Sequence, residues 1–83
     1  MLVEALQEPV RVVVDFNHNK VRPLAFSRAG RRYNVLSVNL VYRKRVGGRY
    51  VWCFAVSDGA NTYGLTYDPE TLCWTLNEIQ TEG

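Results

Sequence analysis

Apolar residues alternate with polar or small ones along most of the chain, with a period of two. Between residues 9 and 16, for example, Val10, Val12, Val14 and Phe16 share one face. Successive side chains on a β-strand point to opposite faces, so this period predicts strands rather than helices. Six strands are predicted, at approximately residues 9–16, 21–28, 32–45, 50–57, 61–67 and 72–79.

The same alternation assigns a face to the apolar side chains of the other five strands. These residues are Leu24, Phe26, Leu36, Val38, Leu40, Tyr42, Tyr50, Trp52, Phe54, Val56, Tyr63, Leu65, Tyr67, Leu72, Trp74 and Leu76. Most are branched or aromatic, as is typical of a half-buried pleated surface.

Short turn sequences separate the strands, which favours an antiparallel meander. They contain Gly, Asn or Asp, which tolerate a positive φ, or Pro, which presets a turn. The turns are Asn17-His18-Asn19, Ala29-Gly30, Gly47-Gly48, Asp58-Gly59 and Asp68-Pro69.

An all-β meander with one apolar face has to cover that face. The only helix candidate is one turn over Leu2 to Gln7, which is too short to do so. We therefore expect a strongly bent sheet or a small, partly open barrel. The predicted third strand is long enough to bend and serve both halves, through a bulge near Ser37 to Asn39.

Length and composition predict one globular domain over residues 1–83, with residues 1–8 as an N-terminal extension. The first residues lack the basic and apolar regions of a signal peptide, and no stretch approaches the length of a membrane helix. We expect a cytoplasmic protein that does not enter a membrane. Cys53 and Cys73 should lie two strands apart and remain free thiols.

Charge is distributed unevenly along the chain. All 10 basic residues lie between Arg11 and Arg49, where Asp15 is the only acid. Two basic clusters flank the predicted third strand, one at each end, each with tyrosines nearby. Such groups can bind phosphates and stack on bases, whereas the simpler interpretation is solvated hairpin ends that protect sheet edges. The candidate contact residues for a partner or nucleic acid are Arg28, Arg31, Arg32, Tyr33, Arg43, Lys44, Arg45 and Arg49.

Residues for catalysis or metal binding are sparse. His18 is the only histidine and lies in a turn, and the cysteines form no CxxC motif. Asp58 and Asp68 are explained as turn formers. We therefore predict no enzyme activity, no metal and no cofactor. The aromatic residues are expected to form the core, with an aromatic groove for a peptide or a methylated cation as the alternative.

Several segments resemble a family of small bacterial β domains of uncharacterised function. They are Glu8-Pro9-Val10, Val21-Arg22-Pro23-Leu24-Ala25-Phe26, Ala29-Gly30-Arg31-Arg32-Tyr33-Asn34-Val35, Tyr63-Gly64-Leu65, Tyr67-Asp68 and Trp74-Thr75-Leu76. The resemblance covers approximately residues 8–79 and implies the fold rather than a chemistry. Some members of the family are associated with DNA-repair polymerases, which points toward nucleic acid. This chain departs from the family over residues 42–48, where a tryptophan-rich segment is expected.

These observations favour a binding module. The leading hypothesis is interaction with a partner protein, or self-association, through an open sheet edge or exposed aromatic surface. The alternative is a nucleic-acid-binding module that uses a basic face.

Overall fold

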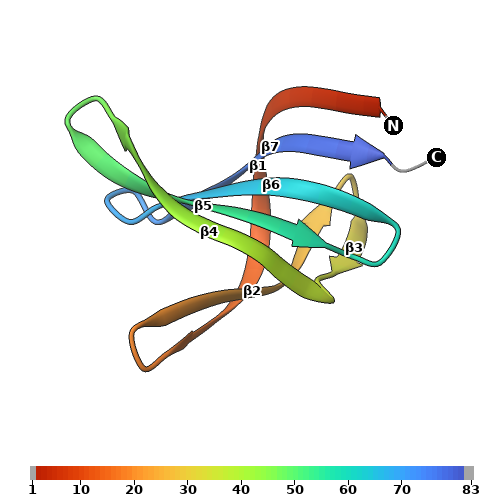
Figure 1. Cartoon of the computed structure of the whole chain (residues 1–83), viewed down its shortest axis with the longest axis horizontal. Helices are drawn as coiled ribbons and strands as arrows, with labels where there is room; N and C mark the ends of the chain where they lie inside the picture. The colour runs from red at the N-terminus through yellow and green to blue at the C-terminus, as the bar shows by residue number, and fades with distance from the viewer. Residues whose placement is uncertain (1, 82–83) are drawn as a thin grey trace.

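The computed structural model describes residues 2–81, which form one seven-stranded antiparallel sheet without a helix (Figure 1). The strand order is β3-β2-β1-β7-β6-β5-β4. The strands are β1 (Leu2–Asn17), β2 (Lys20–Arg28), β3 (Arg31–Asn34), β4 (Ser37–Val46), β5 (Arg49–Ser57), β6 (Asn61–Asp68) and β7 (Cys73–Thr81). The predicted all-β class and antiparallel pairing are confirmed. No helix in this range has the length and apolar character needed to cross a membrane.

The first strand connects two parts of the sheet, one that contains β2 and β3 and one that contains β4, β5, β6 and β7. Residues 2–10 of β1 pair with β7, and residues 11–17 pair with β2. The prediction of a helical turn over Leu2 to Gln7 is wrong, because this segment is the start of β1 and Leu2 lies opposite Thr81. A six-residue helix would gain few hydrogen bonds for its nucleation cost, whereas β7 provides a ladder of partners.

The predicted third strand is in fact two strands, so the prediction of six strands is wrong. β3 pairs with β2, while β4 pairs with β5. At the break, Val35 donates a backbone hydrogen bond to Leu24 on β2, and Leu36 donates one to Ser57 on β5. The segment therefore serves both halves, as predicted, and a register shift between Val38 and Leu40 confirms the expected bulge.

The sheet is strongly bent but is not closed into a barrel. From the break between β3 and β4, strands β2 and β4 diverge toward their hairpin tips (Figure 1). The bend brings the apolar face of the sheet onto itself, which covers this face without a helix.

Eight buried residues of β2, β5, β6 and β7 form the core. Phe26 is the member from β2, and its ring centroid lies 5.0 Å from that of Tyr33 and 5.0 Å from that of Tyr63. The contact with Tyr63 is edge-on, at 70°, which is a favoured aromatic geometry. The core consists of Phe26, Phe54, Val56, Tyr63, Leu65, Tyr67, Trp74 and Leu76.

Several residues assigned to the apolar face are exposed, namely Phe16, Leu24, Leu36, Leu40, Tyr42, Tyr50 and Leu72. Irregular backbone explains two of them. Leu24 is 42% exposed, because the β1–β2 register skips it as the extra residue of a bulge. Leu72 is 72% exposed, because it lies in the β6–β7 turn with a φ of 60° and β7 begins only at Cys73.

Leu72 and Leu76 provide a matched test of where the core ends, between the exposed β6–β7 turn and the buried part of β7. Leu76 is fully buried, so Leu76→Ala should lower the free energy of unfolding by about 2–5 kcal/mol. Leu72→Ala should change it by no more than about 0.5 kcal/mol, since the side chain is exposed. Urea unfolding monitored by tryptophan fluorescence measures both effects. Equal losses would show that Leu72 belongs to the core.

Candidate binding seam

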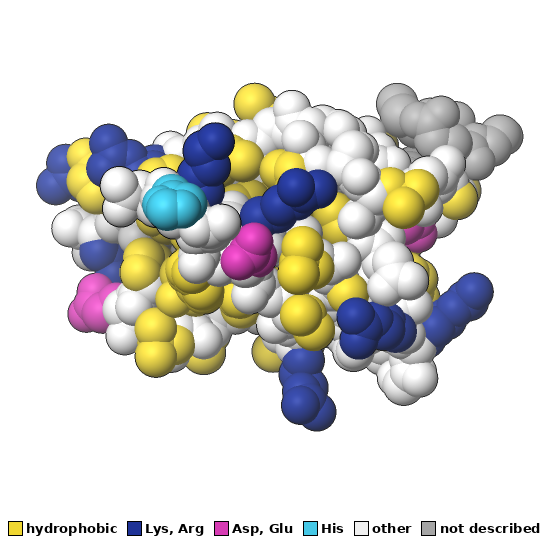
Figure 2. Space-filling view, turned by 90° about the horizontal axis from the view of Figure 1, so that it is seen from below, with side chains coloured by type: hydrophobic (Ala, Val, Ile, Leu, Met, Phe, Trp, Pro, Cys, Tyr) yellow, Lys and Arg dark blue, Asp and Glu magenta, His cyan; other side chains and the backbone are white. Residues whose placement is uncertain are grey.

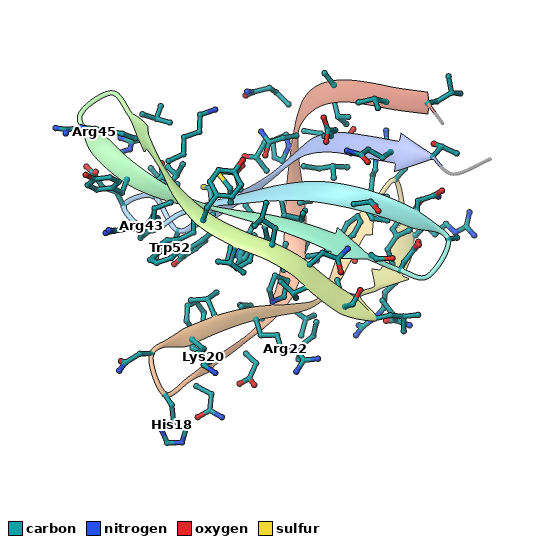
Figure 3. The ribbon with its side chains drawn as sticks, in the orientation of Figure 1. His18, Lys20, Arg22, Arg43, Arg45 and Trp52 are labelled. Carbon is teal, nitrogen blue, oxygen red and sulfur yellow. The ribbon has the colours of Figure 1, made fainter. Side chains whose placement is uncertain are left out.

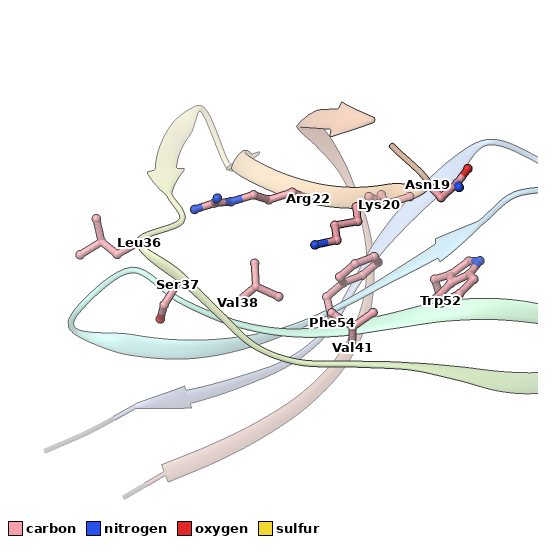
Figure 4. A pocket seen from close by; sticks show the side chains of 10 residues that line it. Asn19, Lys20, Arg22, Leu36, Ser37, Val38, Val41, Trp52 and Phe54 are labelled. Carbon is pink, nitrogen blue, oxygen red and sulfur yellow. The ribbon is translucent and has the colours of Figure 1, made fainter. Parts of the chain in front are cut away.

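An open cleft lies between β2 and β4 and has a volume of about 630 Å³. Trp52 and Phe54 of β5 form its base, with Val38 and Val41 of β4 on one side and β2 on the other (Figure 4). We call this cleft the seam. Its lining residues are Asn19, Lys20, Val21, Arg22, Leu36, Ser37, Val38, Val41, Trp52 and Phe54.

The edge of β4 that faces away from β5 has no partner strand in the described chain. Gly47 and Gly48, with φ values of 56° and 83°, form a two-residue turn that makes Val46 and Arg49 a hydrogen-bonded pair. Hydrogen-bonded and non-hydrogen-bonded pairs alternate along an antiparallel ladder. The backbone groups of Arg45, Arg43 and Val41 therefore point away from β5, toward the free edge.

The bulge at Asn39 decides which side chains of β4 face the seam. The simple alternation predicts that Leu40 and Tyr42 share a face with Val38, and this prediction is wrong. Beyond the bulge, Val41 lies opposite Phe54, while Leu40 lies opposite Ala55 on the other face. Arg43 and Arg45 likewise follow Val41 onto the seam side.

Aromatic rings of β5 support both arginines. The guanidinium carbon of Arg43 lies 4.8 Å from the ring centroid of Tyr50 and 5.8 Å from that of Trp52. That of Arg45 lies 5.8 Å from Tyr50. Cation–π contacts of this kind are worth about 0.5–1 kcal/mol at exposed sites. They hold the guanidinium groups in place beside the cleft.

Lys20 and Arg22 provide cations on the other side of the seam (Figure 3). Together with Arg43 and Arg45 we call them the seam cations. None of the four forms an ion pair with a carboxylate of residues 2–81, where ion pairs involve only Arg28 and Arg49. On the face that carries the β1–β2 hairpin, basic side chains are interspersed with apolar patches (Figure 2).

The sequence prediction missed Lys20 and Arg22, although both belong to the basic part of the chain. The signal that identifies them is spatial, because their strand is far from β4 in sequence and meets it only across the seam.

The cluster at the β2–β3 turn lies away from the seam. Arg28, Arg31, Arg32 and Tyr33 border a separate hollow together with residues of the β5–β6 turn. Arg28 donates a 2.8 Å hydrogen bond to Glu8, and this bond raises the pKa of Arg28. The guanidinium of Arg31 lies 5.6 Å from the Tyr33 ring centroid.

The remaining predicted contact residues are divided between two environments. Arg49 is engaged by Asp68 at 2.6 Å and by Glu70 at 3.8 Å. Burial alone would raise the pKa of Asp68, but the backbone amide of Glu70 and the charge of Arg49 outweigh it and lower the pKa. Lys44 lies opposite Val51 on the outer face. The structure thus brings Arg43 and Arg45 to the seam and places the other predicted residues elsewhere.

Asp58 organises the β5–β6 turn. Its Oδ1 accepts hydrogen bonds from the amides of Ala60 and Asn61, and its Oδ2 accepts one from the Tyr63 hydroxyl. Burial opposes ionisation, but these hydrogen bonds outweigh it and lower the pKa of Asp58. Burial in turn raises the pKa of Tyr63. This arrangement matches the predicted role of Asp58 as a turn former.

The cysteines and the histidine do not converge. Cys53 is buried on β5 and Cys73 is exposed on β7, with β6 between them, and both are free thiols. His18 lies at the tip of the β1–β2 hairpin with a φ of 48°. Within residues 2–81, no three His, Cys, Asp or Glu side chains are grouped to hold a metal ion.

No protein-family model, no curated protein and no solved structure matches the chain. The resemblance to a family of small bacterial β domains remains a prediction, and the seam has to be interpreted from its own geometry.

The lowered pKa of Asp58 predicts a specific dependence of stability on pH. In the unfolded chain this carboxyl should titrate near its ordinary pKa of about 3.9. Its stabilising effect should therefore be complete above that pH and be lost as pH falls through the lower native pKa. As the pH is lowered from about 6 to about 2.5, the free energy of unfolding should therefore fall less for Asp58→Asn than for the parent protein.

Urea unfolding at a series of pH values measures this difference. Asp15→Asn is the control, because the exposed Asp15 carboxylate accepts no hydrogen bond from the described residues. An Asp58→Asn profile parallel to that of the parent protein would contradict the prediction.

Proposed function

We propose that this protein is an interaction module that binds an extended segment of a partner protein by strand addition to β4. The observation that carries the proposal is the free edge of this ten-residue strand. It directs backbone groups of Val41, Arg43 and Arg45 outward, where they are available to a partner strand. Exposed apolar side chains accompany them, at Leu40, Val41, Tyr42 and Val46.

The free edges of β2 and β3 are less suited to pairing. β3 has only four residues. On β2, Asn17 and Lys20 form a hydrogen-bonded pair across a two-residue turn. Because such pairs alternate, the backbone groups of Val21 and Pro23 point away from β1, toward the seam. Pro23 has no N–H to donate, and proline at such a position blocks strand addition. β4 contains no proline.

A second copy of the chain fits this edge poorly. β4 carries Arg43, Lys44 and Arg45 and no acid, so pairing it with another β4 would bring three cations from each copy onto adjacent strands. These charges disfavour pairing with a second β4 but do not disfavour pairing with a strand of another protein that lacks them.

A proline at position 41 tests the proposal. Val41→Pro removes an outward N–H and should leave the β4–β5 ladder intact, whereas Val41→Ala shortens the side chain and keeps the N–H. Peptides selected from a random phage-displayed library on the parent protein serve as probes. We expect Val41→Pro to weaken their binding at least tenfold and Val41→Ala to weaken it much less.

Amide chemical-shift changes on adding a selected peptide locate the binding site. They should concentrate in β4 and in the facing part of β2. Circular dichroism first establishes that both variants retain the parent fold. Selected peptides that perturb a different surface, or that bind Val41→Pro as well as the parent protein, would refute strand addition to β4.

A second proposal, nucleic-acid binding, is favoured by one specific observation. The four seam cations make no ion pair within the described residues, and one of them, Arg43, lies 5.8 Å from the ring of the half-buried Trp52. Arginine forks bind phosphate, and aromatic rings stack on unpaired bases. Because the cluster at the β2–β3 turn lies elsewhere, this proposal depends on the seam alone.

Fluorescence anisotropy with a labelled oligothymidylate tests the second proposal. With three or four phosphate contacts, affinity should fall roughly 20- to 50-fold between about 50 and 200 mM salt. Arg43→Gln should weaken binding and flatten this salt dependence, while Arg31→Gln, far from the seam, should have little effect. Absence of binding at the lower salt concentration would eliminate the proposal.

A further inference from the structure

We infer that the partner segment carries acidic side chains at two alternate positions and an apolar side chain two residues beyond them, all on its seam-facing side. This inference rests on the proposed strand addition and specifies the chemistry of the segment that β4 would accept.

The position of the acids follows from the register of a paired strand. Side chains directly opposite each other on adjacent antiparallel strands have Cβ atoms about 4.5–5.5 Å apart and lie on the same face. Residues opposite Arg43 and Arg45 are therefore separated by two positions and face the seam. A carboxylate at each of them meets a guanidinium that can bind both of its oxygens.

The arginines are prepared for this contact. Arg43 lies over Tyr50 and Trp52, and Arg45 lies over Tyr50, so the rings restrict where the guanidinium groups can go. Less side-chain freedom is then lost when a carboxylate binds. Lys20 and Arg22 add positive charge from the opposite side of the cleft.

The apolar position follows from the base of the seam. A side chain opposite Val41 points into the cleft above Phe54 and Trp52. The aliphatic parts of Lys20 and Arg22 border the same space, as long cationic side chains commonly do beside apolar surface (Figure 4). An apolar residue at this position would be sheltered from water.

Charge complementarity selects an acidic strand over a neutral or basic one. The lining of the seam contains two cations and no acid, and the free edge adds three cations on adjacent residues. A neutral strand would leave these charges crowded without compensation, and a basic strand would be repelled.

Synthetic peptides that differ only in the order of their residues test the inference. One labelled peptide presents Glu-Thr-Glu-Thr-Val within a threonine-rich extended sequence, which is the order that an antiparallel strand places opposite Arg45, Arg43 and Val41, and a second presents the reverse order, which suits a parallel strand. A third has the same composition with the two Glu residues adjacent, so that one of them faces away from the seam. In a fourth, Gln replaces both Glu residues.

An alternating peptide should bind at least about tenfold more tightly than the adjacent-Glu and Gln peptides. Arg43→Gln or Arg45→Gln should remove most of this preference, and Arg31→Gln should preserve it. Arg43→Lys should restore only part of it, since a lysine cannot form the bidentate contact.

Other results would overturn the inference in distinguishable ways. If all peptides bind equally and Val41→Pro abolishes binding, the acidic pattern is wrong while strand addition stands. If acidic peptides bind regardless of Glu order or of Arg43→Gln, the contact is nonspecific attraction and the inference fails. If no peptide binds and the oligothymidylate does, both the inference and strand addition are refuted in favour of nucleic acid.

Discussion

The contact of Phe26 with Tyr63 holds the two parts of the bent sheet against each other. The buried ring of Phe26 on β2 lies between the ring of Tyr33 on β3 and the ring of Tyr63 on β6. A sheet without a helix has to bury its apolar face on itself, and this ring provides the central point of contact. The free edges then follow, because Val35 bonds to Leu24 of β2 and Leu36 to Ser57 of β5, and β2 and β4 diverge from this break (Figure 1).

Much of this fold could be predicted from local chemistry. The turn at Gly47 and Gly48 and the turn at His18 and Asn19 have the positive φ values that their residues favour, so the hairpins fall where the sequence places them. Alternation in β6, and in β5 at Phe54 and Val56, also identified buried side chains, although Val51 and Cys53 on the other face of β5 are buried too. In these strands, local preference and tertiary packing agree.

The errors arose where one extra residue interrupts a strand. Leu24 and Asn39 are two of the residues that the strand registers skip, and each shifts the following side chains to the opposite face. The length of the predicted third strand indicated a bulge near Asn39, but the simple alternation assigned faces as if the strand were regular. No pattern indicated the bulge at Leu24. Pairing over long sequence distances was equally invisible, which explains the missed strand before Pro9 and the missed cations Lys20 and Arg22.

The bulge at Asn39 gives the seam its electrostatic character. Without it, Leu40 and Tyr42 would continue the face of Val38, and the cleft would be bordered by apolar side chains while the arginines pointed to the outer face. With it, Arg43 and Arg45 lie over the rings of Tyr50 and Trp52. One additional residue therefore adds two guanidinium groups to the seam side of the free edge, and charges on an edge strand disfavour pairing with copies of itself.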